Sequence, residues 1–355
     1  MIPTTVYRQA LRYFVFIIIF TLVAIELLLR IFGIGDIRLE SVGKDYYSYY
    51  GKKFNSWYWV NSPHLTYTDK NSDYTIEVKT NSLGHREREP EEVYATKAGI
   101  RIIALGDSFT EGMGTEQDST YVRYLENKVR TIAPEVDFYN AGTSGSDPFF
   151  CYVLLRDKLL KYQPDIVIQT INGSDYTDFV LRGGFERFKA DSTTVFHNAP
   201  WLEPFFHYCY IFRVILALNG YTGDILQKRD DFLRNCETII NPQFIALADS
   251  FLMLASRNGF KMLFVAHPAY GDFMLREAER IQQQLTTVLS AKGHCVVNIW
   301  QPMNDVMKGD NLHRYGYEQD LHFTSLGYQL MAETIFEEVE KRYPGFWKAG
   351  ANFPD

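Results

Sequence analysis

The sequence is poor in cysteine and has no excess of basic residues. Its four cysteines are too few for a disulfide scaffold, and none belongs to a C-x-x-C pair, which argues against a zinc site of that type. The 36 lysines and arginines are outnumbered by 43 aspartates and glutamates, giving a net charge of −7. Nucleic-acid-binding domains usually carry a basic footprint, so we expect no nucleic-acid partner.

Several cofactor and metal motifs are also missing. Gly112-Met113-Gly114 is followed by Gln117, so the G-x-G-x-x-G pattern of dinucleotide-binding proteins does not occur. Neither an H-E-x-x-H motif nor an EF-hand loop is found. We therefore expect neither a metal nor an organic cofactor. The chain does have 355 residues, of which 46% are hydrophobic, and this is enough for a large globular core.

Residues 1–35 are predicted to form a transmembrane anchor. Residues 13–25 carry no charge, and the 18 residues from Arg12 to Arg30 span roughly 27 Å of helix, close to the ~30 Å hydrocarbon layer. Glu26 and Arg30 are four residues apart and can pair near one interface. A cleaved signal peptide is the main alternative, but no small-x-small cleavage site follows the apolar run.

We expect a single-pass protein whose C-terminal domain is periplasmic or otherwise extracytoplasmic. The positive charges on the two sides of the span are nearly balanced, so this orientation rests on the commoner arrangement of a short N-terminal tail left in the cytoplasm.

Residues 36–99 are predicted to be an aromatic-rich, β-containing extension. Residues 44–60 read KDYYSYYGKKFNSWYWV and are expected to pack as β-structure on the main domain; a sugar-stacking or membrane-surface patch is the alternative. Residues 65–68 and 74–80 predict a hairpin with a polar turn at 69–73.

From residue 100 to 345 the pattern predicts one three-layer α/β/α domain. Apolar runs typical of buried parallel strands alternate with helical patterns, which implies a doubly wound, five-stranded parallel sheet. The predicted strands are 101–105, 136–139, 165–170, 261–266 and 295–299, and the predicted helices are 118–132, 149–161, 243–258, 273–291 and 324–341. An insertion at about 175–242 contains a further apolar helix candidate.

Polar segments follow these strands, and ligands bind at the carboxyl ends of strands in such sheets. The segments are Gly106 to Thr110, Asn140 to Gly145, Asn172 to Asp175, His267-Pro268, and Asp320 to His322 before the last helix. A serine needs a base to become a nucleophile, and a histidine base needs a carboxylate to orient it. Ser108, His322 and Asp320 are therefore the candidate catalytic residues for acyl transfer, whereas His267 is expected to be structural or to line the substrate site.

These segments resemble the conserved blocks of the SGNH (GDSL-like) hydrolase family. Gly106-Asp107-Ser108-Phe109-Thr110-Glu111-Gly112 resembles the block with the nucleophile, Asn140 to Gly145 the block whose last glycine lends an oxyanion N–H, and Asp320-Leu321-His322-Phe323-Thr324 the block with acid and base. Thr80 to Arg86 also resembles a segment of membrane-anchored bacterial members. The resemblance implies a flavodoxin-like SGNH hydrolase fold, with the N–H groups of Ser108 and Gly145 in the oxyanion hole.

Two positions depart from the family pattern. The third block is commonly Gly-x-Asn-Asp, but here Ser174 stands where the oxyanion asparagine is expected, and Asn172 lies two residues earlier. Both are candidates for the third oxyanion donor, with Ser174 preferred because Asp175 follows it. Asp320 is two residues before His322 instead of the frequent three, a spacing familiar in the membrane-anchored branch.

The sequence thus predicts a serine-dependent esterase acting outside the cytoplasm. The expected substrate is an O-acetyl or other short acyl ester on a cell-envelope glycan, or another small ester. Two alternatives remain: a polysaccharide O-acyltransferase with the same site, and a catalytically weak glycan-binding or assembly protein.

Overall fold

The computed structural model describes residues 4–35, 51–222, 227–269, 276–308 and 312–348. The chain divides into two compact units. The smaller unit contains residues 1–54 and 180–234, and the larger contains residues 55–179 and 235–355. The first residues of the predicted aromatic segment, 44–50, lie outside the described residues.

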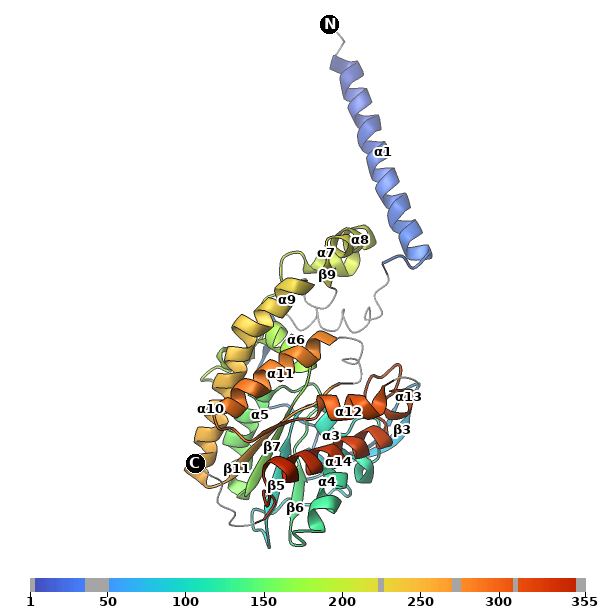
Figure 1. Cartoon of the computed structure of the whole chain (residues 1–355). Coiled ribbons are helices and arrows are strands. Elements are labelled where there is room, and N and C mark those ends of the chain that lie inside the picture. The colour runs from blue at the N-terminus through green and yellow to red at the C-terminus, as the bar shows by residue number, and fades with distance from the viewer. Residues whose placement is uncertain (1–3, 36–50, 223–226, 270–275, 309–311, 349–355) are drawn as a thin grey trace. The chain divides into compact units, whose positions relative to one another are not determined.

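A five-stranded parallel sheet forms the centre of the larger unit (Figure 1). Its strands are β5 (Arg101–Leu105), β6 (Asp137–Asn140), β7 (Ile166–Ile171), β11 (Lys261–Ala266) and β12 (Val296–Asn298). The order is β12-β11-β7-β5-β6, with all neighbouring strands parallel. Read from the β6 edge this is the 2-1-3-4-5 order of flavodoxin-like folds. The predicted doubly wound α/β sheet is confirmed.

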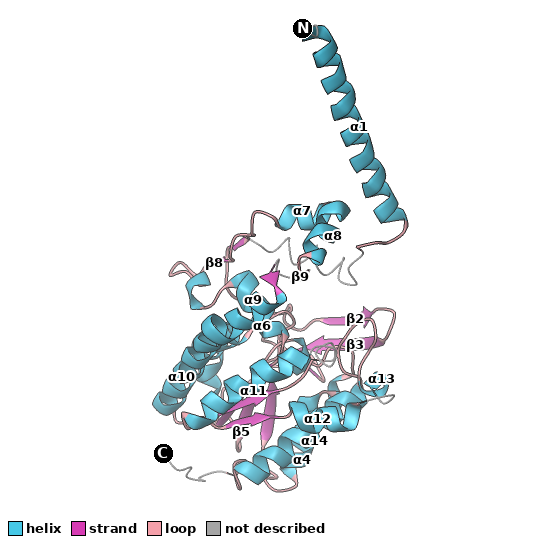
Figure 2. Ribbon diagram, turned by 45° about the horizontal axis from the view of Figure 1, so that its top comes forward, coloured by secondary structure: helices cyan, strands magenta, loops and turns pink. Residues whose placement is uncertain are grey.

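Helices cover both faces of the sheet, which explains why its strands are apolar on both sides (Figures 1 and 2). One layer comprises α4 (Tyr121–Arg130), α12 (Trp300–Met307) and α14 (Ser325–Arg342), and the other comprises α5 (Pro148–Leu154), α10 (Asn241–Asn258) and α11 (Arg276–Ala291). Ile102, Ile168 and Val265 come from three adjacent strands and are fully buried in the core beneath the first layer.

Capping residues mark where these helices begin. The hydroxyl of Thr120 accepts a hydrogen bond from the Arg123 backbone N–H at the start of α4. Asp147 directly precedes Pro148, the first residue of α5, and its side chain accepts hydrogen bonds from the next two backbone N–H groups of that helix. The predicted helix 149–161 is only partly regular. After α5 it continues as a π-turn at Leu155–Leu159 and a 3₁₀ turn at Leu160–Tyr162.

A small antiparallel sheet precedes β5 in the larger unit. It consists of β2 (Thr66–Lys70), β3 (Thr75–Thr80) and β4 (Arg86–Glu87), in the order β2-β3-β4. Ile76 and Val78 alternate with exposed residues along β3 and are buried, as expected for a strand with one face in a core. Short helical segments of this unit are α3 (Ser108–Glu111), η1 (Gln117–Ser119), η5 (Cys236–Ile240) and α13 (Leu312–Tyr315).

The smaller unit begins with the long helix α1 (Thr4–Ile31). Its other elements are β1 (Lys53–Phe54), η4 (Phe185–Arg187), β8 (Thr194–Val195), α7 (Glu203–Tyr208), α8 (Tyr210–Leu218), β9 (Tyr221–Thr222) and β10 (Gln227–Lys228), while α6 (Ser174–Arg182) and α9 (Arg229–Asn235) cross its boundaries. The apolar segment after residue 200 forms two helices, because Cys209 between them is extended (φ −125°, ψ 111°).

Among the described residues, two helical stretches are long and apolar enough to cross a membrane: Val6–Ile31 and Asp231–Asn258. The first lies within the predicted anchor at residues 1–35, and none of the residues in its most apolar window is buried, whereas 39% of those in the second window are buried and the second stretch includes α10. Phe244 and Phe251 of α10 are packed in the larger unit. The second stretch therefore contains a core helix of the α/β domain.

The central strand β7 offers a direct test of this core. We expect Ile168→Ala to lower the free energy of unfolding by about 2–5 kcal/mol, because Ile168 is fully buried and truncation leaves a cavity. Ile239→Ala removes the same atoms from a residue that is 52% exposed, and it should lower the free energy of unfolding much less. Urea unfolding of both variants measures the difference, and equal losses would contradict this assignment of the core.

Candidate active site

Ser108 lies at the turn that joins β5 to α3. The side chain of Asp107 accepts a hydrogen bond from the Phe109 backbone N–H at 3.0 Å and caps this short helix. A side chain at Gly106 would not fit, because its Cβ atom would lie 2.1 Å from the hydroxyl oxygen of Thr170. The turn therefore holds Ser108 at the carboxyl end of the sheet.

Ser108, His322 and Asp320 form a continuous chain of hydrogen bonds. Nε2 of His322 lies 2.7 Å from Oγ of Ser108, and Nδ1 of the same ring lies 2.5 Å from Oδ1 of Asp320. An ionised carboxylate can only accept hydrogen bonds, so Nδ1 carries the proton and Nε2 can accept from the serine hydroxyl. The structure thus brings together Ser108 from one predicted loop and the Asp320–His322 pair from another.

The two-residue spacing of Asp320 and His322 is accommodated by the backbone of Leu321. Leu321 has a φ of 67°, a left-handed conformation that is unusual for a residue with a side chain. Its N–H donates to Tyr317 O at 3.1 Å, and Tyr317 N–H donates to His322 O at 2.9 Å, which closes the turn. The centroids of the Phe109 and His322 rings lie 4.8 Å apart. The turn and the Phe109 ring hold the imidazole in place.

The β2–β3 hairpin also binds Asp320. Asn71 Nδ2 donates to Oδ2 of Asp320 at 2.8 Å, and the Tyr74 hydroxyl donates to the same oxygen at 3.3 Å. The backbone N–H of Asp320 donates to the Asp73 carboxylate at 2.9 Å. Burial raises the pKa of Asp320, but the hydrogen bond and charge of His322 outweigh it, so the pKa lies below its ordinary value. Asp320 is therefore ionised at neutral pH.

The sequence did not reveal this role of the hairpin. Its turn was predicted from the polar residues at 69–73, but nothing in that composition links Asn71 to a carboxylate 249 residues later. The pKa of Tyr74 is raised by burial and by the charges of Asp320 and Asp69, so its phenol stays protonated and keeps its donor. Asn71, Asp73 and Tyr74 are positioning residues around Asp320.

Glu111 organises the glycine-rich loop after β6. Its Oε2 accepts a hydrogen bond from the Ser144 backbone N–H at 2.6 Å. Gly142 packs directly on the same helix, because a Cβ atom there would lie 2.1 Å from the Glu111 backbone nitrogen. Gly145, the predicted oxyanion residue, follows Ser144 and has a φ of 70°, which favours glycine. Glu111 lies within the first motif, but the sequence did not link it to this loop.

The loop after β7 places Asn172 and Ser174 in different environments. Asn172 is 1% exposed and its Nδ2 donates to the Asp107 carboxylate at 2.8 Å. Its side-chain oxygen accepts from both the backbone N–H and the hydroxyl of Ser174, at 2.8 and 2.7 Å. Ser174 is only partly buried. Asn172 therefore supports the loop, whereas Ser174 is the more accessible of the two.

His267 follows β11 and is completely buried. Its Nδ1 lies 2.9 Å from the carbonyl oxygen of Pro268 and must donate to it. Burial lowers the pKa of His267, so the ring is neutral at neutral pH. Its ring packs against Phe109 at a centroid distance of 5.4 Å, and the same Phe109 ring contacts His322.

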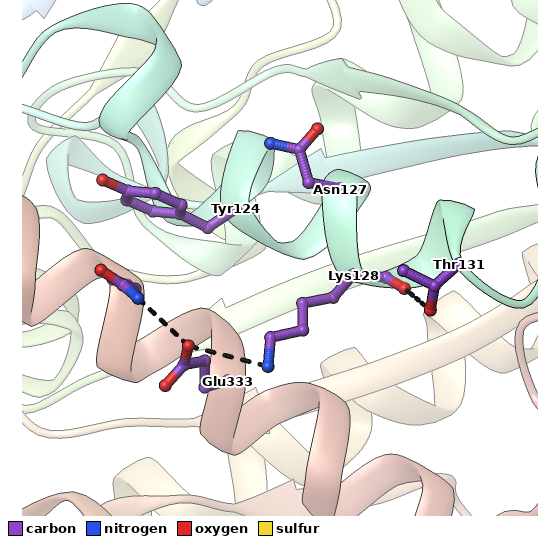
Figure 3. Close-up of a pocket in the computed structure, with 6 residues that line it drawn as sticks. Tyr124, Asn127, Lys128, Thr131 and Glu333 are labelled. Carbon is purple, nitrogen blue, oxygen red and sulfur yellow. Dashed lines mark hydrogen bonds and ion pairs between the residues drawn. The ribbon is translucent and has the colours of Figure 1, made fainter.

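No group of three or more His, Cys, Asp or Glu side chains within the described ranges is arranged to hold a metal ion. A surface hollow of about 260 Å³ lies between α4 and α14, lined by residues that include Tyr124, Asn127 and Lys128 (Figure 3). Lys128 forms an ion pair with Glu333 at 3.6 Å there. None of the candidate site residues lines this hollow.

A three-layer α/β/α fold with a Ser–His–Asp chain at the carboxyl end of its parallel sheet is typical of the SGNH class of hydrolases. Residues 104–330, more than half of the chain, match the model of the GDSL-like Lipase/Acylhydrolase family, and the chain belongs to this family. The protein is therefore an ester-hydrolysing enzyme of the GDSL type. No curated protein sequence matches the chain.

Solved structures with a similar fold include an acetylxylan esterase from Geobacillus stearothermophilus, at 14% identity and a TM-score of 0.42, covering 69% of this chain and 96% of that one. A two-domain esterase active on acetylated mannans has 16% identity and a TM-score of 0.39, covering 72% and 52%. An α/β hydrolase from the metagenome of Lake Arreo, Spain, has 13% identity and a TM-score of 0.44, covering 72% and 99%.

The hairpin contact predicts a specific kinetic effect. We expect Asn71→Ala to lower kcat about tenfold with little change in KM, because it removes a hydrogen bond to the charged Asp320 without touching the ester. Steady-state kinetics with a small chromogenic ester measures both constants.

Ser72→Ala is the matched control. The Ser72 hydroxyl lies in the same turn but bonds Gln319 at 2.9 Å rather than Asp320, so kcat should change less than about twofold. Equal losses in both variants would show that the turn acts only through general stability, and would remove the positioning role of Asn71.

Proposed function

We propose that Ser108, His322 and Asp320 hydrolyse an acyl ester through a covalent acyl-enzyme. The supporting observation is the hydrogen-bond chain that joins Ser108 Oγ, the His322 ring and the Asp320 carboxylate. Ser108 Oγ attacks the acyl carbonyl while His322 Nε2 takes its proton. His322 then returns this proton to the leaving alkoxide, and the acyl group stays on Ser108.

Water completes the reaction in the second half. His322 Nε2 takes a proton from a water molecule, the resulting hydroxide attacks the acyl carbonyl, and the proton passes to Ser108 Oγ as the carboxylic acid product leaves and ionises in the solvent. Asp320 stays ionised throughout and orients the imidazole, which agrees with its lowered pKa. The mechanism uses no metal or organic cofactor.

The proposed oxyanion hole consists of the backbone N–H groups of Ser108 and Gly145 and the hydroxyl of Ser174. The Ser174 hydroxyl now donates to Asn172, but the backbone N–H of Ser174 donates to the same oxygen. If the hydroxyl turns toward the substrate, the Asn172 oxygen keeps one donor. Asn172 itself is buried and bound to Asp107, so we assign it a supporting role.

The proposed substrate is an O-acetyl or other short acyl ester on a cell-envelope glycan. This rests on the resemblance of Thr80 to Arg86 to the membrane-anchored branch of the family, and on the aromatic side chains beside the site. The ring centroids of Tyr74 and Tyr317 lie 5.4 Å apart, and the Tyr74 hydroxyl donates a hydrogen bond to Asp320. Tyr74 is buried, whereas Tyr317 is only partly buried, so the Tyr317 ring can offer an apolar face on which a sugar ring can pack.

We further propose that α1 is a retained membrane anchor and that the hydrolase is extracytoplasmic. Glu26 of α1 accepts hydrogen bonds from the backbone N–H groups of Tyr210 and Ile211 at 3.0 and 2.9 Å. Removal of α1 as a signal peptide would leave the start of α8 without these acceptors. N-terminal sequencing of the mature protein should find residues before Glu26, and protease added to spheroplasts should digest the C-terminal domain.

The nucleophile can be tested by substitution and by covalent labelling. We expect Ser108→Ala to reduce ester hydrolysis by about 10³-fold or more, because the three residues act as a unit, and to abolish labelling by a fluorophosphonate. Ser250→Ala, which changes a serine of α10 bonded to Ala246 O, should leave both unchanged. Wild-type turnover in purified Ser108→Ala would refute the assignment. Acyl transfer to an added glycan in preference to water would identify an acyltransferase.

Ser174 and Asn172 should respond differently to substitution. We expect Ser174→Ala to lower kcat about 10²-fold with unchanged thermal stability, as for loss of an oxyanion donor, and Ser174→Asn to restore or raise it. Asn172→Ala leaves the buried Asp107 carboxylate with one donor fewer, so it should lower stability by about 1–3 kcal/mol. A larger kcat loss in Asn172→Ala at full stability would transfer the donor role to Asn172.

A further inference from the structure

The α7–α8 segment of the smaller unit has its charged side chains on the inside. Between Trp201 and Leu218 the charged residues are Glu203 and Arg213, and they are only 1% and 2% exposed. Glu203 lies 2.8 Å from the buried His207 ring. Arg213 donates to backbone carbonyls, including Phe206 O at 3.0 Å. Helices that face water normally show the opposite arrangement.

Large apolar side chains occupy the outside of the same segment. The exposed fractions are 78% for Trp201, 53% for Phe205, 61% for Tyr208, 50% for Ile215 and 82% for Leu218. We call these five side chains the α7–α8 surface. Trp201 and Phe205 are aromatic neighbours with centroids 6.4 Å apart. Five large, exposed apolar side chains within 18 residues are more typical of an interaction surface than of a solvated one.

The contacts of α1 indicate what covers this surface. The Glu26 carboxylate accepts hydrogen bonds from the first two backbone N–H groups of α8, and the Arg30 side chain donates to Tyr208 O at 2.7 Å. The Arg30 guanidinium also lies 4.5 Å from the centre of the Tyr210 ring. These contacts bind α7–α8 to the last turns of α1. Glu26 and Arg30 are the first charged residues of α1 after Arg12 and follow its long uncharged run. They therefore lie at one end of the proposed span.

We propose that the α7–α8 surface inserts into the interfacial layer of the same membrane that α1 anchors. Trp and Tyr rings are favoured at this depth, and interfacial helices bury Phe and Leu side chains at the boundary of headgroups and acyl chains. The inward orientation of Glu203 and Arg213 leaves no charge on the described outer positions to oppose insertion. The proposal rests on the proposed anchoring of α1, but not on the chemistry at Ser108.

Photocrosslinking in a bilayer tests the proposal on the full chain. A benzophenone amino acid is introduced singly in place of Phe16, Phe205, Leu218 or Tyr94, and each protein is reconstituted in nanodiscs of phosphatidylethanolamine and phosphatidylglycerol. Phe16 reports on α1, and Tyr94 is a 69% exposed aromatic side chain of the other unit. Because all four side chains are exposed, folding should be retained, and hydrolysis of a small ester verifies it.

We expect lipid adducts, identified by mass spectrometry, at positions 16, 205 and 218, with at least tenfold less lipid adduct at position 94. Lipid adducts at 16 but not at 205 or 218 would overturn the interfacial surface while leaving the anchor intact. Adducts to protein at 205 and 218 would also overturn it and identify a partner chain or a second copy. Absence of lipid adducts at position 16 would refute the anchor and, with it, this proposal.

Discussion

A parallel sheet that is buried on both faces can hold polar functional side chains only in the loops at the ends of its strands, and this constraint shapes the larger unit. Residues of β5, β7 and β11 are almost entirely buried, so ligand-facing groups must lie in the loops beyond the strands. Ser108 follows β5 and Asn172 follows β7, and the last loop before α14 brings His322 within 2.7 Å of Ser108. The reactive groups lie together because the strands are parallel.

Polar groups that do not touch the ester make up much of the site. Asp107 caps the turn at Ser108 and accepts from Asn172, while Glu111 holds the backbone of Ser144. Because buried polar atoms are costly without partners, each of these contacts restricts a loop to one conformation. The β2–β3 hairpin applies the same principle to Asp320 through Asn71. Orientation of the triad is therefore distributed over several elements outside the short motifs.

The α7–α8 segment of the smaller unit reverses the usual arrangement of charged and apolar side chains. Arg213 and Glu203 are buried while Phe205 and Leu218 are exposed, which is unfavourable in water and favourable beside acyl chains. Within this unit, the hydrogen bond from the Tyr210 backbone N–H to Glu26 joins α8 to α1, two segments 184 residues apart in the chain. Membrane attachment through both α1 and the α7–α8 surface would give the enzyme two contacts with the bilayer in place of one.

The strands of the sheet, the apolar run of α1 and the candidates Ser108, His322 and Asp320 could all be predicted from sequence, because buried parallel strands and the loops after them carry local signals. The partners that hold these residues could not be predicted: Asn71 binds Asp320, Glu111 binds the backbone of Ser144, and Glu26 binds the start of α8. Nor did the sequence reveal that the apolar segment after residue 200 breaks at Cys209 and turns its charges inward. Such contacts join residues far apart in the chain, and hydrophobic periodicity records only which side of an element is buried, not what it meets.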